Sequence, residues 1–139
     1  MRLWLARWVT SGVEENLRRC GEECERAADA GADLVVFPEL FLTGYGLGLE
    51  AGRARARFAE LSGATPETLY VFGTIDEDGR NRLTAWLGGR EVAHYDKICL
   101  FRPNREHELW TPGERVVALA WRGLRVGFLV CNDLRFPEL

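Results

Sequence analysis

The segment Gly31-Ala32-Asp33-Leu34-Val35-Val36-Phe37-Pro38-Glu39-Leu40 decides the fold class of this chain. Residues 34 to 37 are apolar at every position, which is typical of a parallel strand covered by helices and not of a half-exposed hairpin. Gly31 suits the C-terminal cap of a preceding helix. A buried strand that follows a helix indicates an α/β fold, and Glu39 then lies just beyond the end of a central strand.

Strands and helices alternate along the rest of the chain. The apolar patterns predict helices over residues 13 to 30 and 53 to 61 and strands over residues 2 to 9, 69 to 75, 82 to 87, 91 to 95, 116 to 121 and 124 to 130, with turns at Gly88-Gly89 and Arg122-Gly123. We expect residues 2 to 9, 34 to 37, 69 to 75 and 124 to 130 to form one sheet. Helices would cover one face of that sheet and leave the other face apolar.

Composition excludes several classes of protein. With 139 residues, of which 47% are hydrophobic and 28% charged, the chain has the profile of a single globular domain over residues 1–139. Its net charge of -3 provides no basic field for nucleic acid. The N-terminal apolar run is too short and too charged for a secretory signal, and no stretch approaches the length of a membrane span. We therefore expect a cytoplasmic protein with reduced cysteines and neither nucleic acid nor membrane as a partner.

Two further segments place reactive side chains beyond predicted strands. Lys97 follows Tyr95-Asp96, and Cys131 follows the apolar run that ends at Val130. A thiol attacks as its thiolate, so a reactive Cys131 needs a nearby base or positive charge to lower its pKa. Glu39 can be that base. Lys97 can supply the positive charge and, with the backbone N–H of Asn132, stabilise an oxyanion. The ordered set predicts acyl transfer through a cysteine.

These residues carry a family resemblance. The Glu39 segment with Thr43-Gly44-Tyr45, the Lys97 segment with Leu100-Phe101, and the final segment from Cys131 to Leu139 resemble, in order, the three signatures of the nitrilase superfamily of carbon-nitrogen hydrolases. The ending Asp-Leu-Arg-Phe-Pro-Glu-Leu is similar to the amidase branch, which includes ω-amidase-like members.

The resemblance implies a fold, an activity and a site. The fold is the N-terminal half of a four-layer α-β-β-α sandwich, and the activity is hydrolysis of a linear amide or related small molecule through a cysteine thioester, with no metal or organic cofactor. The triad falls on Glu39, Lys97 and Cys131. A second glutamate falls on Glu106, whose distance from the Thr111-Pro112-Gly113 turn fits better than that of Glu108.

The same resemblance raises the question of length. Family members run to about twice this length, near the upper end of ordinary single-domain size. We therefore expect the domain to be truncated after the nucleophile motif, as a split gene product or a fragment, and to pair with a second copy or a complementary chain. The alternative to an active hydrolase is a catalytically silent fragment or interaction module of the same fold.

Simpler interpretations apply to other residues. Cys20 and Cys24 share the apolar stripe of a helix and are expected to be core residues, as is Cys99. His94 and His107 fit no zinc spacing with these cysteines. Gly44, Gly46 and Gly48 lack the pattern of a dinucleotide-binding loop and are expected to allow a tight turn. Cys131 alone would favour a buried core thiol, and only its combination with the other site residues favours a nucleophile.

Overall fold

The structure, a computed structural model, describes residues 1–45 and 51–139, except for the side chain of Ala51. Gly46 and Gly48, expected at a tight turn, lie outside the described residues. The elements in chain order are β1 (Leu3–Leu5), α1 (Val13–Asp29), β2 (Leu34–Val36), α2 (Ala51–Ala64), β3 (Leu69–Ile75), β4 (Asn81–Leu87), β5 (Arg90–Asp96), η1 (Arg102–Asn104), α3 (Glu106–Leu109), β6 (Ala118–Trp121), β7 (Leu124–Gly127) and η2 (Cys131–Arg135).

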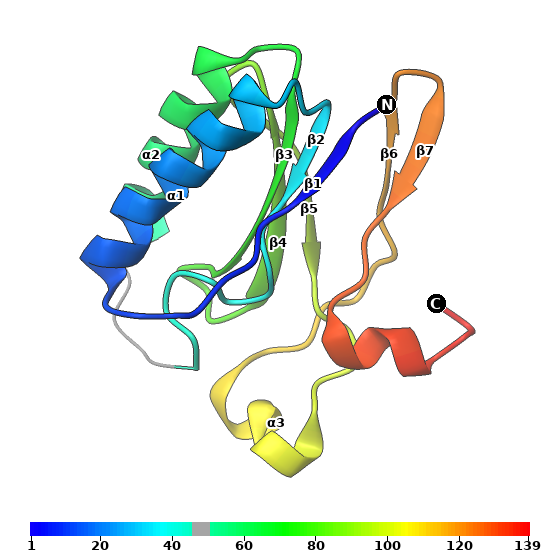
Figure 1. The fold of residues 1–139 in the computed structure, drawn as a ribbon. Coiled ribbons are helices and arrows are strands. Elements are labelled where there is room, and N and C mark those ends of the chain that lie inside the picture. The colour runs from blue at the N-terminus through cyan, green and yellow to red at the C-terminus, as the bar shows by residue number, and fades with distance from the viewer. Residues whose placement is uncertain (46–50) are drawn as a thin grey trace.

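A five-stranded sheet in the order β1-β2-β3-β4-β5 forms the centre of the fold. The first three strands are parallel and the last two pairings are antiparallel. Helices α1 and α2 lie side by side on one face of the sheet (Figure 1). The predicted α/β class is therefore confirmed. β2 is an inner strand, as expected, although β3 occupies the middle of the sheet.

The helix face holds an aromatic core. Phe58 of α2 stacks on Phe72 of β3 with ring centroids 4.0 Å apart, and Phe37 packs on Phe72 at 5.1 Å. Cys20 and Cys24 of α1 are 0% and 4% exposed and belong to this core, as the apolar stripe predicted. Burial of these side chains holds α1 and α2 against the sheet.

The last two strands correct the expected topology. β6 and β7 form a separate two-stranded sheet, so residues 124 to 130 do not join the main sheet. The chain leaves β5 at the edge of the main sheet and returns as a hairpin over the face opposite the helices (Figure 1). There Trp121, Phe128 and Val130 join a second core with Val71 and Tyr95. The order helix layer, sheet, second sheet is the one expected for the first three layers of the sandwich.

The apolar face predicted opposite the helices is only partly covered. The pairing of Leu3 with Leu34 and of Leu5 with Val36 puts all four side chains on the hairpin side of the sheet. Leu3 and Leu5 remain 50% and 66% exposed. The hairpin therefore covers the middle of this face and leaves the β1 edge open.

The first strand is shorter than its apolar pattern predicted. β1 ends at Leu5, and one further backbone hydrogen bond joins Ala6 N to Val36 O at 2.9 Å. The chain then departs, because Trp8 packs its ring edge against Phe37 and Phe41 in the helix-side core. No helix in the described part of the chain combines the length and apolar character needed to cross a membrane.

Candidate active site

Three segments that follow strands meet at one place. Glu39 lies three residues beyond β2, Lys97 follows β5 directly, and Cys131 is the first residue of η2. A fourth residue, Glu106, opens the short helix α3. The sequence separation between Glu39 and Lys97 is 58 residues, so only the sheet brings them together.

Lys97 is the centre of the cluster. Its Nζ donates to Glu39 Oε1 at 2.7 Å and to Glu106 Oε1 at 3.0 Å, and Glu106 Oε2 is 2.9 Å away. Lys97 and Glu106 are both 0% exposed. Burial alone would lower the pKa of Lys97, but the hydrogen bonds and charges of the two glutamates outweigh it and raise that pKa. The ammonium is therefore held in its charged form.

Glu106 has its oxygens fully engaged. Besides Lys97, the Tyr45 hydroxyl donates to Oε1 at 3.1 Å and the Phe101 backbone N–H donates to Oε2 at 2.7 Å. Glu108, the other candidate, is exposed and pairs with Arg105. A carboxylate whose two oxygens both accept these hydrogen bonds is suited to orient Lys97. Glu39 is the carboxylate with room for proton transfer, since its side chain is 20% exposed.

Cys131 is exposed and lies beside this cluster. The structure places it as an exposed free cysteine, close enough to Glu39 for that carboxylate to act on the pKa of its thiol. Partial burial and the charge of Glu39 raise the pKa of the thiol, and the opposing charge of Lys97 does not reverse the shift. Lys97 does lower the pKa of the thiol, as expected, but burial and the two glutamates raise that pKa by more. The thiol therefore releases its proton less readily than an ordinary cysteine does.

The backbone is strained at these positions. Among the described residues, four that are not glycine have positive φ, namely Leu40 (51°), Arg105 (58°), Arg122 (47°) and Cys131 (48°). Leu40 follows Glu39, Arg105 precedes Glu106, and Cys131 is itself the candidate nucleophile. Such conformations cost about 1–3 kcal/mol each and cluster at functional sites. The positive φ of Cys131 turns its side chain out of the line of the preceding strand.

Two glycines allow the supporting backbone to approach closely. A Cβ on Gly73 of β3 would lie 2.5 Å from Pro38 O and 2.9 Å from Glu39 Cα. A Cβ on Gly113 would lie 2.1 Å from Asp96 O, next to Lys97. Gly113 N also donates to Lys97 O at 2.8 Å. The Thr111-Pro112-Gly113 turn therefore packs directly on the backbone that carries the lysine.

The side chain of Asn132 is held by a structural hydrogen bond. Its side-chain Nδ2 donates to Cys99 O at 3.0 Å, which fixes the turn after Cys131. The side chain is thus engaged in structure, and an oxyanion contact would have to come from the backbone N–H, as the sequence suggested. That role stays a prediction.

Asp133 is a site residue that sequence reasoning missed. It is 0% exposed and accepts hydrogen bonds from Tyr95 OH at 2.8 Å, Cys99 N at 2.7 Å and Val130 N at 2.9 Å. These bonds tie η2 to the end of β5, and so hold Cys131 near Lys97. The available signal was a carboxylate three residues after an apolar strand, where burial requires partners.

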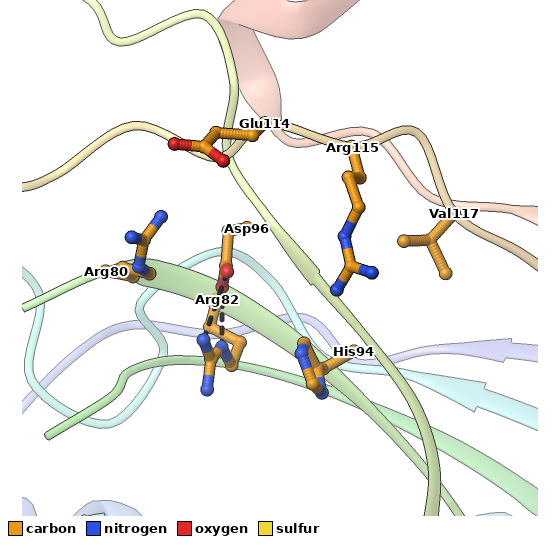
Figure 2. Close-up of a pocket in the computed structure, with 7 residues that line it drawn as sticks. All are labelled: Arg80, Arg82, His94, Asp96, Glu114, Arg115 and Val117. Atoms are coloured by element: carbon orange, nitrogen blue, oxygen red, sulfur yellow. Dashed lines mark hydrogen bonds and ion pairs between the residues drawn. The ribbon is translucent and has the colours of Figure 1, made fainter. Parts of the chain in front are cut away.

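The pocket drawn in Figure 2 is separate from this cluster. It is lined by Arg80, Arg82, His94, Asp96, Glu114, Arg115 and Val117, and Arg82 donates to Asp96 Oδ2 at 3.0 Å. Asp96 is the residue before Lys97, so this network braces the strand end that carries the lysine. Among the described residues, no three His, Cys, Asp or Glu side chains are grouped so that they could hold a metal ion.

Comparison with known proteins finds related hydrolases. A hydrolase in the pqqF 5′ region of Pseudomonas protegens is 34% identical over 91% of this chain and 48% of its own length. Omega-amidase YafV of Escherichia coli K12 is 33% identical over 88% of this chain and 50% of its own length. The chain therefore spans about half the length of the curated relatives it matches.

Solved structures show the same fold. A mutant of the Nesterenkonia AN1 amidase from the nitrilase superfamily superposes with a TM-score of 0.85 at 25% identity, over 99% of this chain and 58% of that one. A carbon-nitrogen hydrolase from Helicobacter pylori gives a TM-score of 0.88 at 16% identity, over 99% of this chain and 53% of that one. The carbon-nitrogen hydrolase family matches residues 5–139. The chain thus belongs to the carbon-nitrogen hydrolase family.

Proposed function

We propose that this chain carries the catalytic residues of an amidase that hydrolyses linear amides through a thioester on Cys131. The observation that supports this most strongly is the buried Lys97 ammonium. It is bonded to Glu39 at 2.7 Å and to Glu106 at 3.0 Å, near a thiol whose pKa Glu39 raises. Amidase relatives support the substrate class.

In the first half-reaction, the Cys131 sulfur attacks the amide carbon while Glu39 accepts the thiol proton. The carbon-oxygen double bond opens to an oxyanion. Lys97 has three N–H donors, and the two glutamates occupy two of them, so the third is available to the oxyanion. The carbon-nitrogen bond then breaks as Glu39 returns the proton to the nitrogen. Ammonia leaves and the acyl group remains on sulfur.

In the second half-reaction, water replaces ammonia. Glu39 takes a proton from the water, whose oxygen attacks the thioester carbon, and Lys97 again stabilises the oxyanion. The carbon-sulfur bond breaks, and the proton on Glu39 passes to the departing sulfur. The products are the carboxylic acid and free Cys131, which restores the starting state. No redox partner is needed.

The cell compartment and the assembly are part of the same proposal. Cys20, Cys24, Cys99 and Cys131 are all free thiols, which supports a reducing cytoplasm. The apolar side chains of Leu3 and Leu5 on the open sheet edge support association with a second copy.

The test is hydrolysis of a panel of linear amides, with ammonia release as the readout and intact-protein mass spectrometry to detect the acyl adduct. We expect ammonia release and an adduct that maps to Cys131, both of which disappear in Cys131→Ala. Turnover that persists in Cys131→Ala would refute the covalent route. If the protein associated with its second copy shows neither turnover nor an adduct, the alternative of a catalytically silent interaction module is favoured.

A further inference from the structure

Asn81 touches two residues of the candidate site at once. It is the first residue of β4 and is 1% exposed. Its side-chain Nδ2 donates to Glu39 Oε1 at 2.7 Å, and its backbone oxygen accepts from Lys97 N at 2.9 Å. One buried residue therefore contacts both the candidate base and the backbone of the candidate ammonium.

The contact with Glu39 restricts the orientation of its carboxylate. Lys97 Nζ and Asn81 Nδ2 both donate to the same oxygen, Oε1, each at 2.7 Å. An ionised carboxylate only accepts hydrogen bonds, so the amide must present its NH2 group there. With two donors on Oε1, the other carboxylate oxygen of Glu39 is left for further groups. The Cys131 thiol is near enough for Glu39 to raise its pKa.

We propose that Asn81 is a positioning residue that fixes the Glu39 carboxylate for proton transfer with Cys131. The catalytic meaning of this inference rests on the proposed function. The strand supplies the rigidity, because Asn81 is held in register with Ile75 of β3 while β4 pairs with β5 on its other side. Asn81 is buried, so it acts through Glu39.

Two substitutions of Asn81 distinguish positioning of Glu39 from simple space filling. Asn81→Asp keeps the size of the side chain but replaces the donor by an acceptor, which repels Glu39 Oε1 at hydrogen-bond distance. Asn81→Ala removes the donor and leaves a small gap. If Asn81 only filled space, Asp would be the milder change. If it positions Glu39, Asp is the more harmful change.

We expect kcat for amide hydrolysis to fall about tenfold in Asn81→Ala and further in Asn81→Asp, because the lost hydrogen bond is to a charged group. KM should stay within about threefold, since a buried residue makes no substrate contact. Rates are expressed per titratable Cys131, counted only in the folded fraction that thermal unfolding gives, so that unfolded protein does not count. A milder loss in Asn81→Asp than in Asn81→Ala would overturn the inference.

A second readout needs no substrate. Without the Asn81 donor the Glu39 carboxylate is no longer held toward the Cys131 thiol and raises its pKa less, so iodoacetamide should alkylate Cys131 about threefold faster in Asn81→Ala. In a Glu39→Gln background the same substitution should change the rate by less than about 1.5-fold, because Asn81 acts through Glu39. Equal effects in the two backgrounds would overturn the inference, even if the protein hydrolyses no amide and the proposed function fails.

Asn16 provides the matched control. It is a buried asparagine, 0% exposed, whose Nδ2 donates to Leu42 O at 2.7 Å and to Ser11 O at 3.0 Å, with no bond to Glu39. Asn16→Ala should lower the melting temperature while leaving the rates per titratable Cys131 unchanged. If Asn16→Ala reproduces the rate changes of Asn81→Ala, the effect is general destabilisation and the inference is wrong.

Discussion

Gly73→Ala should disable the candidate site without changing any of its reactive side chains. The new Cβ would lie 2.5 Å from Pro38 O and 2.9 Å from Glu39 Cα. Both neighbours are backbone atoms, so no side chain can rotate away to relieve the clash. The glycine does not have a positive φ, which leaves this close approach as the reason that a side chain is excluded.

The size of the effect follows from the clash. To restore an ordinary van der Waals distance of 3.4 Å from Pro38 O, the segment that carries Glu39 must retreat by about 0.9 Å. A displacement of about 1 Å at a reacting group can cost about 100-fold in rate. Overpacking costs about 1–3 kcal/mol of folding free energy, which corresponds to a melting temperature lower by roughly 3–12 °C for a domain of this size.

The assay compares amide hydrolysis and thermal unfolding of Gly73→Ala with those of Gly127→Ala. Gly127 is also a strand glycine, and a Cβ there meets nothing within 4 Å. The control should keep its activity and stability. Activity of Gly73→Ala within threefold of the parent, at an unchanged melting temperature, would refute the argument that Gly73 sets the position of Glu39.

Three further predictions follow from the same geometry. Alkylation of Cys131 should begin to accelerate at a higher pH than that of an ordinary thiol, because its pKa is raised. Glu39→Gln should speed alkylation at neutral pH while abolishing turnover. Slower alkylation in Glu39→Gln would contradict the prediction. Lys97→Arg should lose about 3–4 kcal/mol of transition-state stabilisation, since a planar guanidinium cannot replace the compact ammonium, and kinetics within threefold of the parent would show that Lys97 has no catalytic role. The chain should sediment as a dimer or larger species at micromolar concentration, because Leu3 and Leu5 are 50% and 66% exposed on an open sheet face; a stable 15.7 kDa monomer would count against this.

Local patterns were sufficient to predict most elements of the fold. The strand over residues 69 to 75 and the hairpin at Gly88-Gly89 agree with the structure, because strand patterns and turn glycines depend on neighbouring residues alone. Patterns could not place residues 124 to 130 in the correct sheet. The choice between the main sheet and a separate hairpin depends on how Trp121 and Phe128 pack against distant strands.

For the candidate site too, the sequence predicted some features and not others. The residue types and their order along the chain singled out Glu39, Lys97 and Cys131, since each follows an apolar segment. Glu106 came only from the family resemblance, through its distance from the Thr111-Pro112-Gly113 turn. The partners of these residues could not be predicted. Asn81 lies 42 residues from Glu39 in the sequence, and no local pattern marks it as a neighbour.

The pKa of the Cys131 thiol shows what sequence patterns cannot predict. The sequence by itself determined that a carboxylate, an ammonium and a thiol follow strands of one α/β fold. Only the tertiary structure decided that burial and the two carboxylates around Lys97 together outweigh its ammonium, so that the net pKa shift of Cys131 is upward. The reason is physical, because a pKa depends on the sum of burial and every nearby charge, and that sum exists only once the chain has folded.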